Sequence, residues 1–194
     1  TGGKIILHLI PLESFNHNYN IDWKMVINER SKLRPIYASN CNYRINLDGL
    51  LSYNWSVNNK SYSYVQLYRN GIIEAVEGFI LREERKERLI PSECYEAELI
   101  ESLRGFLNLL KELGVTMPMS IFLTLIGVEG WKMCVDRNVS QVFDDDHKID
   151  RNILQLPETI VESYDTTPAD ILRPMFDIIW YACGYQRSFN FDEA

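Results

Sequence analysis

The sequence predicts an α+β fold in which a mainly antiparallel sheet packs against two principal helices. Three observations support this fold class. Residues 62–81 have the pattern of two strands joined at Asn70-Gly71, and an Asn-Gly pair between apolar runs is a strong hairpin signal. The other strand-like runs also come in hairpin-like groups, which favours antiparallel pairing. Two segments, 92–113 and 167–184, show the apolar spacing of amphipathic helices.

Two registers are compatible with this hairpin. With a two-residue turn of type I′, Leu67 faces Glu74. We prefer this register because Asn and Gly both tolerate the positive φ that such a turn requires. With a three-residue turn and a bulge at Gly71, Gln66 faces Glu74 instead. The registers differ by one residue, so the choice decides which side chains are partners across the hairpin.

The segments before the hairpin are predicted to be strands joined by loops. Residues 4–10 (KIILHLI) are almost continuously apolar, which is typical of a buried strand. Residues 43–53 form a second predicted strand, with a bulge expected at Asp48-Gly49. The asparagine-rich residues 12–20 between them are predicted to be a loop or a short helical turn.

The first long helix is predicted at 92–113. Ser92 is its expected N-cap, and Gly114 is a suitable residue to follow its last turn. A strand at 119–126 follows, and residues 131–135 are predicted to return beside it as its partner. The helix has an apolar stripe that we expect to pack on the sheet, made of Leu99, Leu103, Phe106 and Leu110.

The last predicted elements are a broken strand and a second long helix. Residues 152–161 have a strand pattern interrupted at Pro157, which suits the edge of a sheet or a bulge. Thr167 begins a capping box for the second helix, with a proline at the first helical position. Pro174 lies inside this helix, so we expect a kink or a late start there.

The bulk composition is that of an ordinary globular domain. The chain has 194 residues, of which 46% are hydrophobic and 24% are charged. We expect a single α+β domain over 1–184 and a loose tail over 185–194. The chain begins Thr-Gly-Gly, without Met, and leads straight into a strand. We therefore expect it to be part of a longer protein.

The charge balance argues against a nucleic-acid-binding surface formed by this chain as a whole. The formal net charge is −7 and the isoelectric point is about 5.0, whereas nucleic-acid-binding domains usually carry a basic surface. The basic cluster at 82–88 (REERKER) contains three glutamates that nearly cancel its charge. We interpret it as a solvated segment.

The cysteines and the apolar runs predict a cytoplasmic protein that does not enter a membrane. The longest apolar run, 117–128, is interrupted by polar residues and is too short to span a bilayer. No CxxC motif occurs, and scattered thiols fit a reducing compartment, although a disulfide pair remains open at this point. The four cysteines are Cys41, Cys94, Cys134 and Cys183.

Three charged residues lie in or beside strands of the predicted sheet. Arg69 and Glu74 could be diagonal neighbours across the hairpin, with Asp48 on a nearby strand. A surface ion pair is the simpler interpretation, and such pairs contribute little stability. A polar binding site on the sheet, to which Trp131 is a further candidate contributor, is the functional interpretation.

The sequence offers weaker support for other catalytic or metal-binding residues. His8 lies in a very apolar strand, where a core or rim histidine is the simpler interpretation. Asp144, Asp145, Asp146 and His147 are adjacent, whereas calcium loops space their ligands at alternate positions and include a glycine. We therefore expect no metal and no cofactor. No nucleophile, phosphate-loop or zinc motif is present, so no catalytic residue is assigned.

Several segments together resemble one protein family over nearly the whole chain. They are KIILHLIPL at 4–12, NLDGLL at 46–51, QLYRNGIIEAV at 66–76, LIGVEGW at 125–131, LPE at 156–158 and ADILRPMFDIIW at 169–180. These segments are similar to the C-terminal region of bacterial Schlafen-AlbA-like proteins, which are described as DNA-binding, ATP-binding or transcriptional-regulator proteins. The resemblance implies a preceding Schlafen-AlbA-like domain, absent from this chain, that carries the nucleic-acid or nucleotide function. It assigns no site residue here.

Three functions from different classes remain open. The first, which we favour, is a non-enzymatic C-terminal module for dimerisation, sensing or partner binding in a bacterial regulator or defence protein. In this case the chain forms a homo-oligomer, and nucleic acid binds only through the missing N-terminal domain. The second is a hydrolase or nuclease with an acidic site that includes His8, Asp48, Glu74 or the 144–147 loop. The third is a small-ligand sensor with an aromatic pocket that includes Tyr62, Tyr64, Tyr68 and Trp131.

Overall fold

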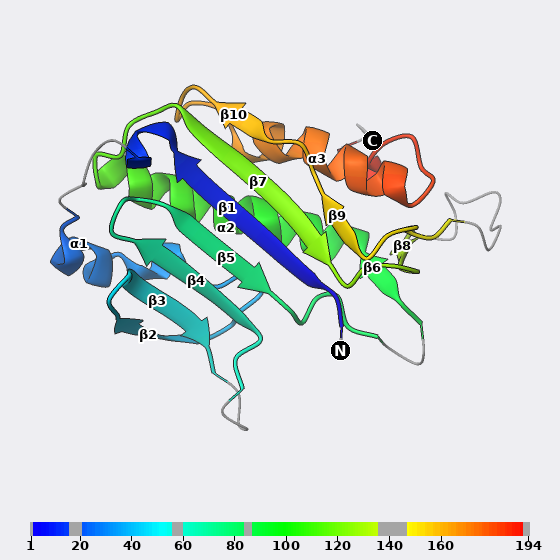
Figure 1. Cartoon of the computed structure of the whole chain (residues 1–194), viewed down its shortest axis with the longest axis horizontal. Coiled ribbons are helices and arrows are strands. Elements are labelled where there is room, and N and C mark those ends of the chain that lie inside the picture. The colour runs from blue at the N-terminus through cyan, green and yellow to red at the C-terminus, as the bar shows by residue number, and fades with distance from the viewer. Residues whose placement is uncertain (1, 16–20, 56–59, 84–86, 136–146, 192–194) are drawn as a thin grey trace.

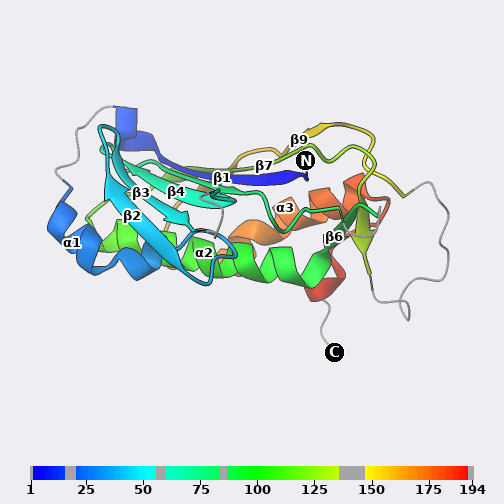
Figure 2. The same ribbon diagram turned by 90° about the horizontal axis from the view of Figure 1, so that it is seen from below.

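The computed structural model describes residues 2–15, 21–55, 60–83, 87–135 and 147–191. One large antiparallel sheet forms one layer, and two long helices form a second layer on one of its faces (Figures 1 and 2). The predicted fold class is therefore confirmed. The strand order is β10-β7-β1-β5-β4-β3-β2, with β9 also on β7. The strands are β1 (Lys4–Pro11), β2 (Cys41–Ile45), β3 (Gly49–Asn54), β4 (Ser63–Tyr68), β5 (Ile73–Glu77), β7 (Met119–Ile126), β9 (Ile153–Gln155) and β10 (Thr159–Val161).

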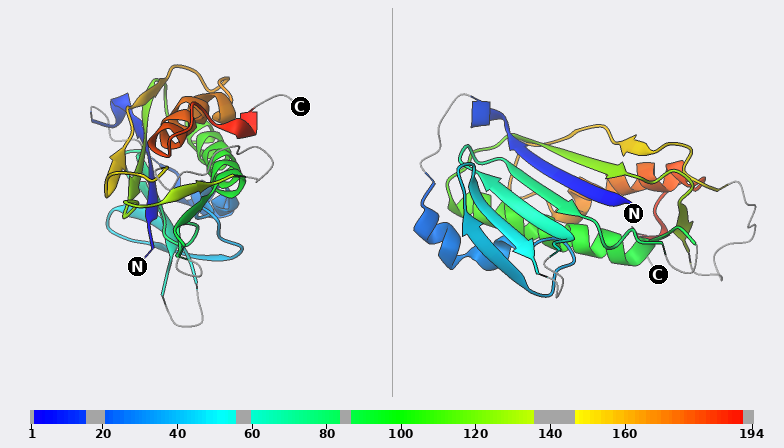
Figure 3. Two further views of the ribbon diagram at one scale, coloured as in Figure 1. Left: turned by 90° about the vertical axis from the view of Figure 1, so that its right-hand side faces the viewer. Right: turned by 60° about the horizontal axis from the view of Figure 1, so that its bottom comes forward.

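The helices cover one face of this sheet along most of its length. They are α2 (Ser92–Glu112) and α3 (Pro168–Ala182), and a short α1 (Trp23–Asn28) lies near the β2–β3 edge (Figure 3). The described residues also form 3₁₀ turns at η1 (Leu12–Phe15), η2 (Arg30–Leu33) and η3 (Phe189–Phe191). A two-stranded parallel sheet pairs β6 (Leu89–Pro91) with β8 (Lys132–Cys134).

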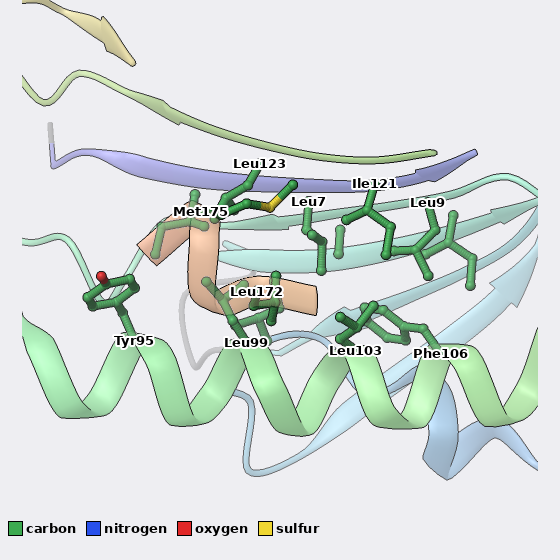
Figure 4. Packing of buried hydrophobic residues seen from close by; sticks show 14 of the residues in the cluster. Leu7, Leu9, Tyr95, Leu99, Leu103, Phe106, Ile121, Leu123, Leu172 and Met175 are labelled. Carbon is green, nitrogen blue, oxygen red and sulfur yellow. The ribbon is translucent and has the colours of Figure 1, made fainter. Parts of the chain in front are cut away.

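The core lies between the sheet and the helices. The predicted α2 stripe is fully buried, as are the side chains of β1 and β7 that face it. In Figure 4, side chains from α2 and α3 point toward those of β1 and β7. The residues that pack here are Leu7, Leu9, Leu99, Leu103, Phe106, Ile121, Leu123, Leu172 and Met175.

The preferred register of the hairpin is wrong, and the three-residue turn is correct. Gln66 is paired with Glu74 and Leu67 with Ile73. Gly71 has a φ of 85°, but Asn70 does not lie in the left-handed region, so a type I′ turn cannot form. Asn70 is held by the tertiary structure, since its carbonyl oxygen accepts a hydrogen bond from the hydroxyl of Ser14 at 2.7 Å.

Two further strand predictions need correction. The expected bulge at Asp48-Gly49 is instead the end of a tight turn between β2 and β3, which Asn46 closes by accepting the Gly49 N–H at 2.8 Å. The expected pairing of residues 131–135 with β7 does not occur. β9 occupies that edge of β7, so β8 pairs with β6 instead. The broken edge strand is confirmed, because β9 and β10 both pair with β7.

The ends of the helices differ from the prediction in detail. Pro91 rather than Ser92 is the N-cap of α2, and the Ser92 hydroxyl donates to the carbonyl of Cys134 at 2.9 Å. Thr167 caps α3 as predicted, accepting the N–H of Asp170 at 3.2 Å. The helix runs from Pro168 through Pro174 without a late start.

The C-terminal segment is packed rather than loose as far as residue 191. Ser188 is 2% exposed, and its hydroxyl donates to the Glu96 carboxylate at 3.0 Å. Asn190 donates to the same carboxylate at 2.9 Å. The expected tail fails here because Phe189 and Phe191 pack against aromatic rings of α3, an interaction that spacing along the chain does not reveal.

Candidate functional site

The second face of the sheet is covered by no helix among the described residues, and Figure 1 looks directly onto it. Successive side chains of a strand point to opposite faces of the sheet. The residues that alternate with the buried, helix-facing ones therefore point away from the helices. We call this surface the uncovered face. It is mostly apolar and its side chains are largely half-buried by one another. It comprises Ile6, His8, Ile10, Leu51, Tyr53, Tyr64, Gln66, Tyr68, Glu74, Val76, Phe122, Thr124 and Ile126.

The pairing of the strands places the polar members of this face beside one another. His8 on β1 is directly opposite Glu74 on β5, and it is opposite Phe122 on its other side. Glu74 is in turn opposite Gln66 on β4. This row crosses the middle of the sheet, so polar groups lie at the centre of an apolar surface.

A hydrogen-bonded group, the His8–Glu74–Tyr64 cluster, forms at this point. His8 Nε2 lies 3.1 Å from Glu74 Oε2, and the Tyr64 hydroxyl donates to Glu74 Oε1 at 2.8 Å. Each carboxylate oxygen therefore has one protein partner. Burial and the hydrogen bond to Glu74 raise the pKa of Tyr64 to about 12, and burial with the nearby Glu74 charge also raises the pKa of Tyr68. Both phenols therefore remain neutral donors at physiological pH.

A shallow hollow of about 420 Å³ lies beside this cluster on the same face. Tyr64 and Leu51 form part of its lining, together with Tyr53 and the edge residue Arg44. Half-exposed tyrosine rings beside an apolar hollow are common where another protein docks, because they offer a large apolar area and one polar end.

The sequence-predicted site residues are only partly brought together. Glu74 lies in the cluster, but the expected Arg69–Glu74 neighbours do not pair. The Arg69 side chain instead donates to the Leu47 carbonyl at 2.7 Å and lies over the ring of Trp23. Asp48 is exposed in the β2–β3 turn, where its carbonyl accepts the Arg69 N–H at 2.9 Å.

The remaining candidates lie elsewhere. Trp131 is 2% exposed and belongs to the core, so it cannot line an open aromatic pocket with the three tyrosines. Tyr64 and Tyr68 share the uncovered face, whereas Tyr62 contacts Phe79. Residues 144–146 lie outside the described residues, and the His147 ring packs edge-on against Tyr185.

The sequence contained a signal for the cluster that the preferred register concealed. The three-residue turn places Gln66 opposite Glu74, and Tyr64 and Tyr68 are then on the same face as Glu74. The partnership of His8 with Glu74 had no local signal, because the two residues are 66 positions apart in the chain.

Comparisons with known proteins give no match to any family model, curated protein or solved structure. The Schlafen-AlbA-like relationship therefore stays a prediction. Within the described parts of the chain, no group of three or more His, Cys, Asp or Glu side chains is arranged to hold a metal ion. In the same parts of the chain, every helix is too short or too polar to cross a bilayer.

Proposed function

We propose that this chain is a non-enzymatic dimerisation module, and that a second copy of the chain covers the uncovered face. The observation that carries the proposal is a mostly apolar surface over five neighbouring strands of the sheet, β7-β1-β5-β4-β3, with no helix on it among the described residues. Exposed apolar surfaces of this extent in soluble domains usually mark an interface.

The size of the face supports a protein partner. Five strands spaced at about 4.8 Å, with a rise of about 3.4 Å per residue, give a flat area of roughly 500–600 Å² before side-chain relief is added. A standard protein interface buries about 800 Å² on each partner. Two copies packed sheet against sheet would place the layers about 10 Å apart, as in a β-sandwich.

The charge distribution favours a second copy. The whole chain carries a net charge of −7, so two copies repel each other unless the contacting surfaces are neutral. On the uncovered face Glu74 is the one carboxylate among the side chains named above, and the cations Lys4 and Arg44 lie on β1 and β2. This face therefore contributes little of the acidic charge.

The His8–Glu74–Tyr64 cluster fits the centre of such an interface. A buried charge is costly when it has no partner, but both Glu74 oxygens already accept hydrogen bonds within the chain. A partner can therefore cover the cluster without leaving these oxygens unpaired. The cluster also adds direction to an otherwise non-directional apolar contact.

The test is the molecular mass in solution, measured by sedimentation equilibrium over a range of concentrations. We expect the wild-type chain to dimerise and Phe122→Glu to be monomeric, because a charge would be buried within the contact. The matched control is Leu47→Glu, at an 88% exposed apolar residue in the β2–β3 turn, away from this face. It should dimerise as the wild type does. A wild-type chain that stays monomeric at all concentrations, or a Phe122→Glu chain that still dimerises, contradicts the proposal.

An enzymatic function is the second candidate, favoured by the 3.1 Å contact between His8 and Glu74. A His–carboxylate pair can act as a general base when it reaches a substrate proton. We rank it second because both oxygens of Glu74 are engaged and the pair lies on a broad surface. Nuclease or esterase activity that is lost in His8→Asn, with dimerisation intact, would reverse this ranking.

The resemblance extends the proposal to a cytoplasmic bacterial regulator or defence protein in which dimerisation would pair two DNA-binding domains. The free state of all four cysteines supports a reducing compartment. The acidic net charge supports DNA contacts made outside this chain. A salt titration of labelled duplex DNA against this chain should detect no sub-micromolar binding near physiological ionic strength.

A further inference from the structure

A cavity of about 480 Å³ lies on the helix side of the sheet, away from the uncovered face. Its walls come from the segment 34–40, the ends of β3, β4 and β5, and one residue of α2. The volume is in the range of about 300–1,000 Å³ that is usual for small-molecule sites. The side chains that matter for recognition are Tyr37, Trp55, Tyr62, Phe79, Glu77 and Glu98.

Aromatic rings are concentrated around this cavity. Among the described residues, six aromatic side chains are exposed, and three of them, Tyr37, Trp55 and Tyr62, line it. The rings of Tyr37 and Phe79 are nearly parallel at a centroid distance of 6.0 Å, and Tyr62 approaches Phe79 at 5.5 Å. Exposed rings gathered at one concavity offer flat apolar surfaces on which a planar molecule can stack.

The position of Phe79 is fixed by a buried carboxylate. Glu77 is fully buried, and it accepts the backbone N–H groups of Phe79 at 2.5 Å and Ile80 at 2.9 Å. These bonds shape the turn after β5 and direct the Phe79 ring toward Tyr37 and Tyr62. Burial raises the pKa of Glu77, so holding a carboxylate at this position is costly and the turn is a specified feature.

Tyr37 is held in a conformation that tyrosine rarely adopts. Its φ is 59°, and no other non-glycine residue among those described has a positive φ. The left-handed region costs an L-residue about 1–2 kcal/mol. The backbone N–H of Tyr37 donates to Glu98 Oε2 at 3.2 Å, which ties the segment to α2. In this conformation the Tyr37 side chain lines the cavity and stays exposed to solvent.

The charge at the cavity is acidic. Glu77 and Glu98 are acidic lining residues and Arg34 is the basic one, with its guanidinium 3.7 Å from Glu98 Oε2. The hydrogen bond and the ion pair of Glu98 both use Oε2, and its side chain keeps an exposure of 28% at the cavity. An acceptor in this position suits a ligand with N–H donors, whereas the net negative charge opposes a phosphate.

We propose that this cavity binds a planar, uncharged heteroaromatic compound with adjacent N–H donors, of which a guanine nucleoside is the representative. The base stacks on the rings of Tyr37 and Trp55. Its N1–H and exocyclic amino group donate to the Glu98 carboxylate, and the sugar hydroxyls meet the polar wall formed by Ser39, Asn40 and Asn54. A nucleotide carrying a phosphate binds less well. The site is independent of the dimer interface.

The test is isothermal titration calorimetry of the full chain with guanosine, adenosine and guanosine 5′-monophosphate. We expect saturable binding of guanosine and at least tenfold weaker binding of the monophosphate. Tyr37→Gly should abolish binding without harming the fold, because glycine accepts the positive φ that tyrosine resists. Glu98→Gln should weaken guanosine binding at least tenfold by removing the charged acceptor.

The matched control is Tyr181→Ala, which removes a 58% exposed tyrosine from α3, outside the cavity. It should leave guanosine binding unchanged. The proposal is overturned if no nucleoside binds at millimolar concentration, or if binding is the same in wild type, Tyr37→Gly and Glu98→Gln. Tighter binding of the monophosphate than of guanosine would also overturn it. None of these outcomes depends on whether the chain dimerises.

Discussion

The two faces of the central sheet are similarly apolar, yet the helices of the described residues cover only one of them. β1 shows this most clearly, since Ile5, Leu7 and Leu9 are fully buried while Ile6 and Ile10, on the opposite face, are not. A nearly continuous apolar run is typical of a strand buried on both faces. The second face of β1 therefore has the composition of a buried surface without the cover. This difference is the main reason for assigning the face to an interface.

The two carboxylates on the two sides of the sheet show the same contrast. Glu96, on the helix side, is 2% exposed and accepts hydrogen bonds from Tyr95, Trp180, Ser188 and Asn190. Glu74, on the uncovered face, has two partners and keeps a side-chain exposure of 26%. A buried carboxylate needs its full set of donors, whereas water can supply part of that set at the open face.

Truncating one side chain on each apolar surface should give the largest difference in the loss of unfolding free energy. Leu103→Ala removes a fully buried side chain of α2, and we expect it to lower the free energy of unfolding by about 2–5 kcal/mol. Phe122→Ala on the uncovered face should cost clearly less in the monomer, because water already reaches its ring. Urea unfolding at a concentration below that of dimerisation measures both. Equal losses would show that the two faces are equally covered.

Removing each of the two carboxylates separately should give the next largest difference in the loss of unfolding free energy. Glu96→Ala leaves the buried Trp180 indole N–H without its acceptor at 2.7 Å, and each such group costs about 1–3 kcal/mol. Glu74→Ala should cost less than about 1 kcal/mol, since the freed groups of His8 and Tyr64 can bind water. Chemical unfolding of the two variants checks the order. A larger loss for Glu74→Ala would contradict the contrast between the faces.

The smallest expected effect is a dependence of stability on pH. Burial raises the pKa of Glu96 above its ordinary value of 4.5, because desolvation outweighs the hydrogen bonds that it accepts. The folded state then binds the proton more tightly than the unfolded state, so this contribution favours folding at low pH. It is lost as the pH rises from 4.5 through the raised folded value. Glu96→Gln removes this titration.

The measurement is the difference in unfolding free energy between wild type and Glu96→Gln at several pH values from 4 to 8. We expect the wild type to lose stability relative to the variant as the pH increases through this window. Other titrating groups are shared by the two chains and cancel in the difference. A difference that is constant, or that rises with pH, would mean that burial does not control this carboxylate.

Much of the fold was predictable because its signals are local. The α2 stripe of Leu99, Leu103, Phe106 and Leu110 is buried as its spacing predicted. Thr167 caps α3, and the strand pattern broken at Pro157 became two short edge strands. Periodicity, capping residues and prolines act within a few positions of the chain, so they can be recognised without knowing what lies nearby in space.

The candidate site was predictable only in part. The apolar run at 4–10 and the hairpin pattern identified His8, Glu74 and Tyr64 as strand residues, but not as partners. Their grouping depends on the one-residue choice of register at Gly71 and on the placement of β1 beside β5. The cavity at Tyr37 had no signal in the sequence, because it joins segments far apart in the chain.

The sequence by itself determined the fold class, the two long helices and the strand composition that makes β1 apolar on both faces. Only the tertiary structure decided the hairpin register, the partner of β8 and the docking of Ser188 and Asn190 on Glu96. The physical reason is the range of the interactions. Helix periodicity and caps are satisfied within one or two turns of chain, whereas strand partners and buried polar groups are satisfied by residues that only the folded chain brings together.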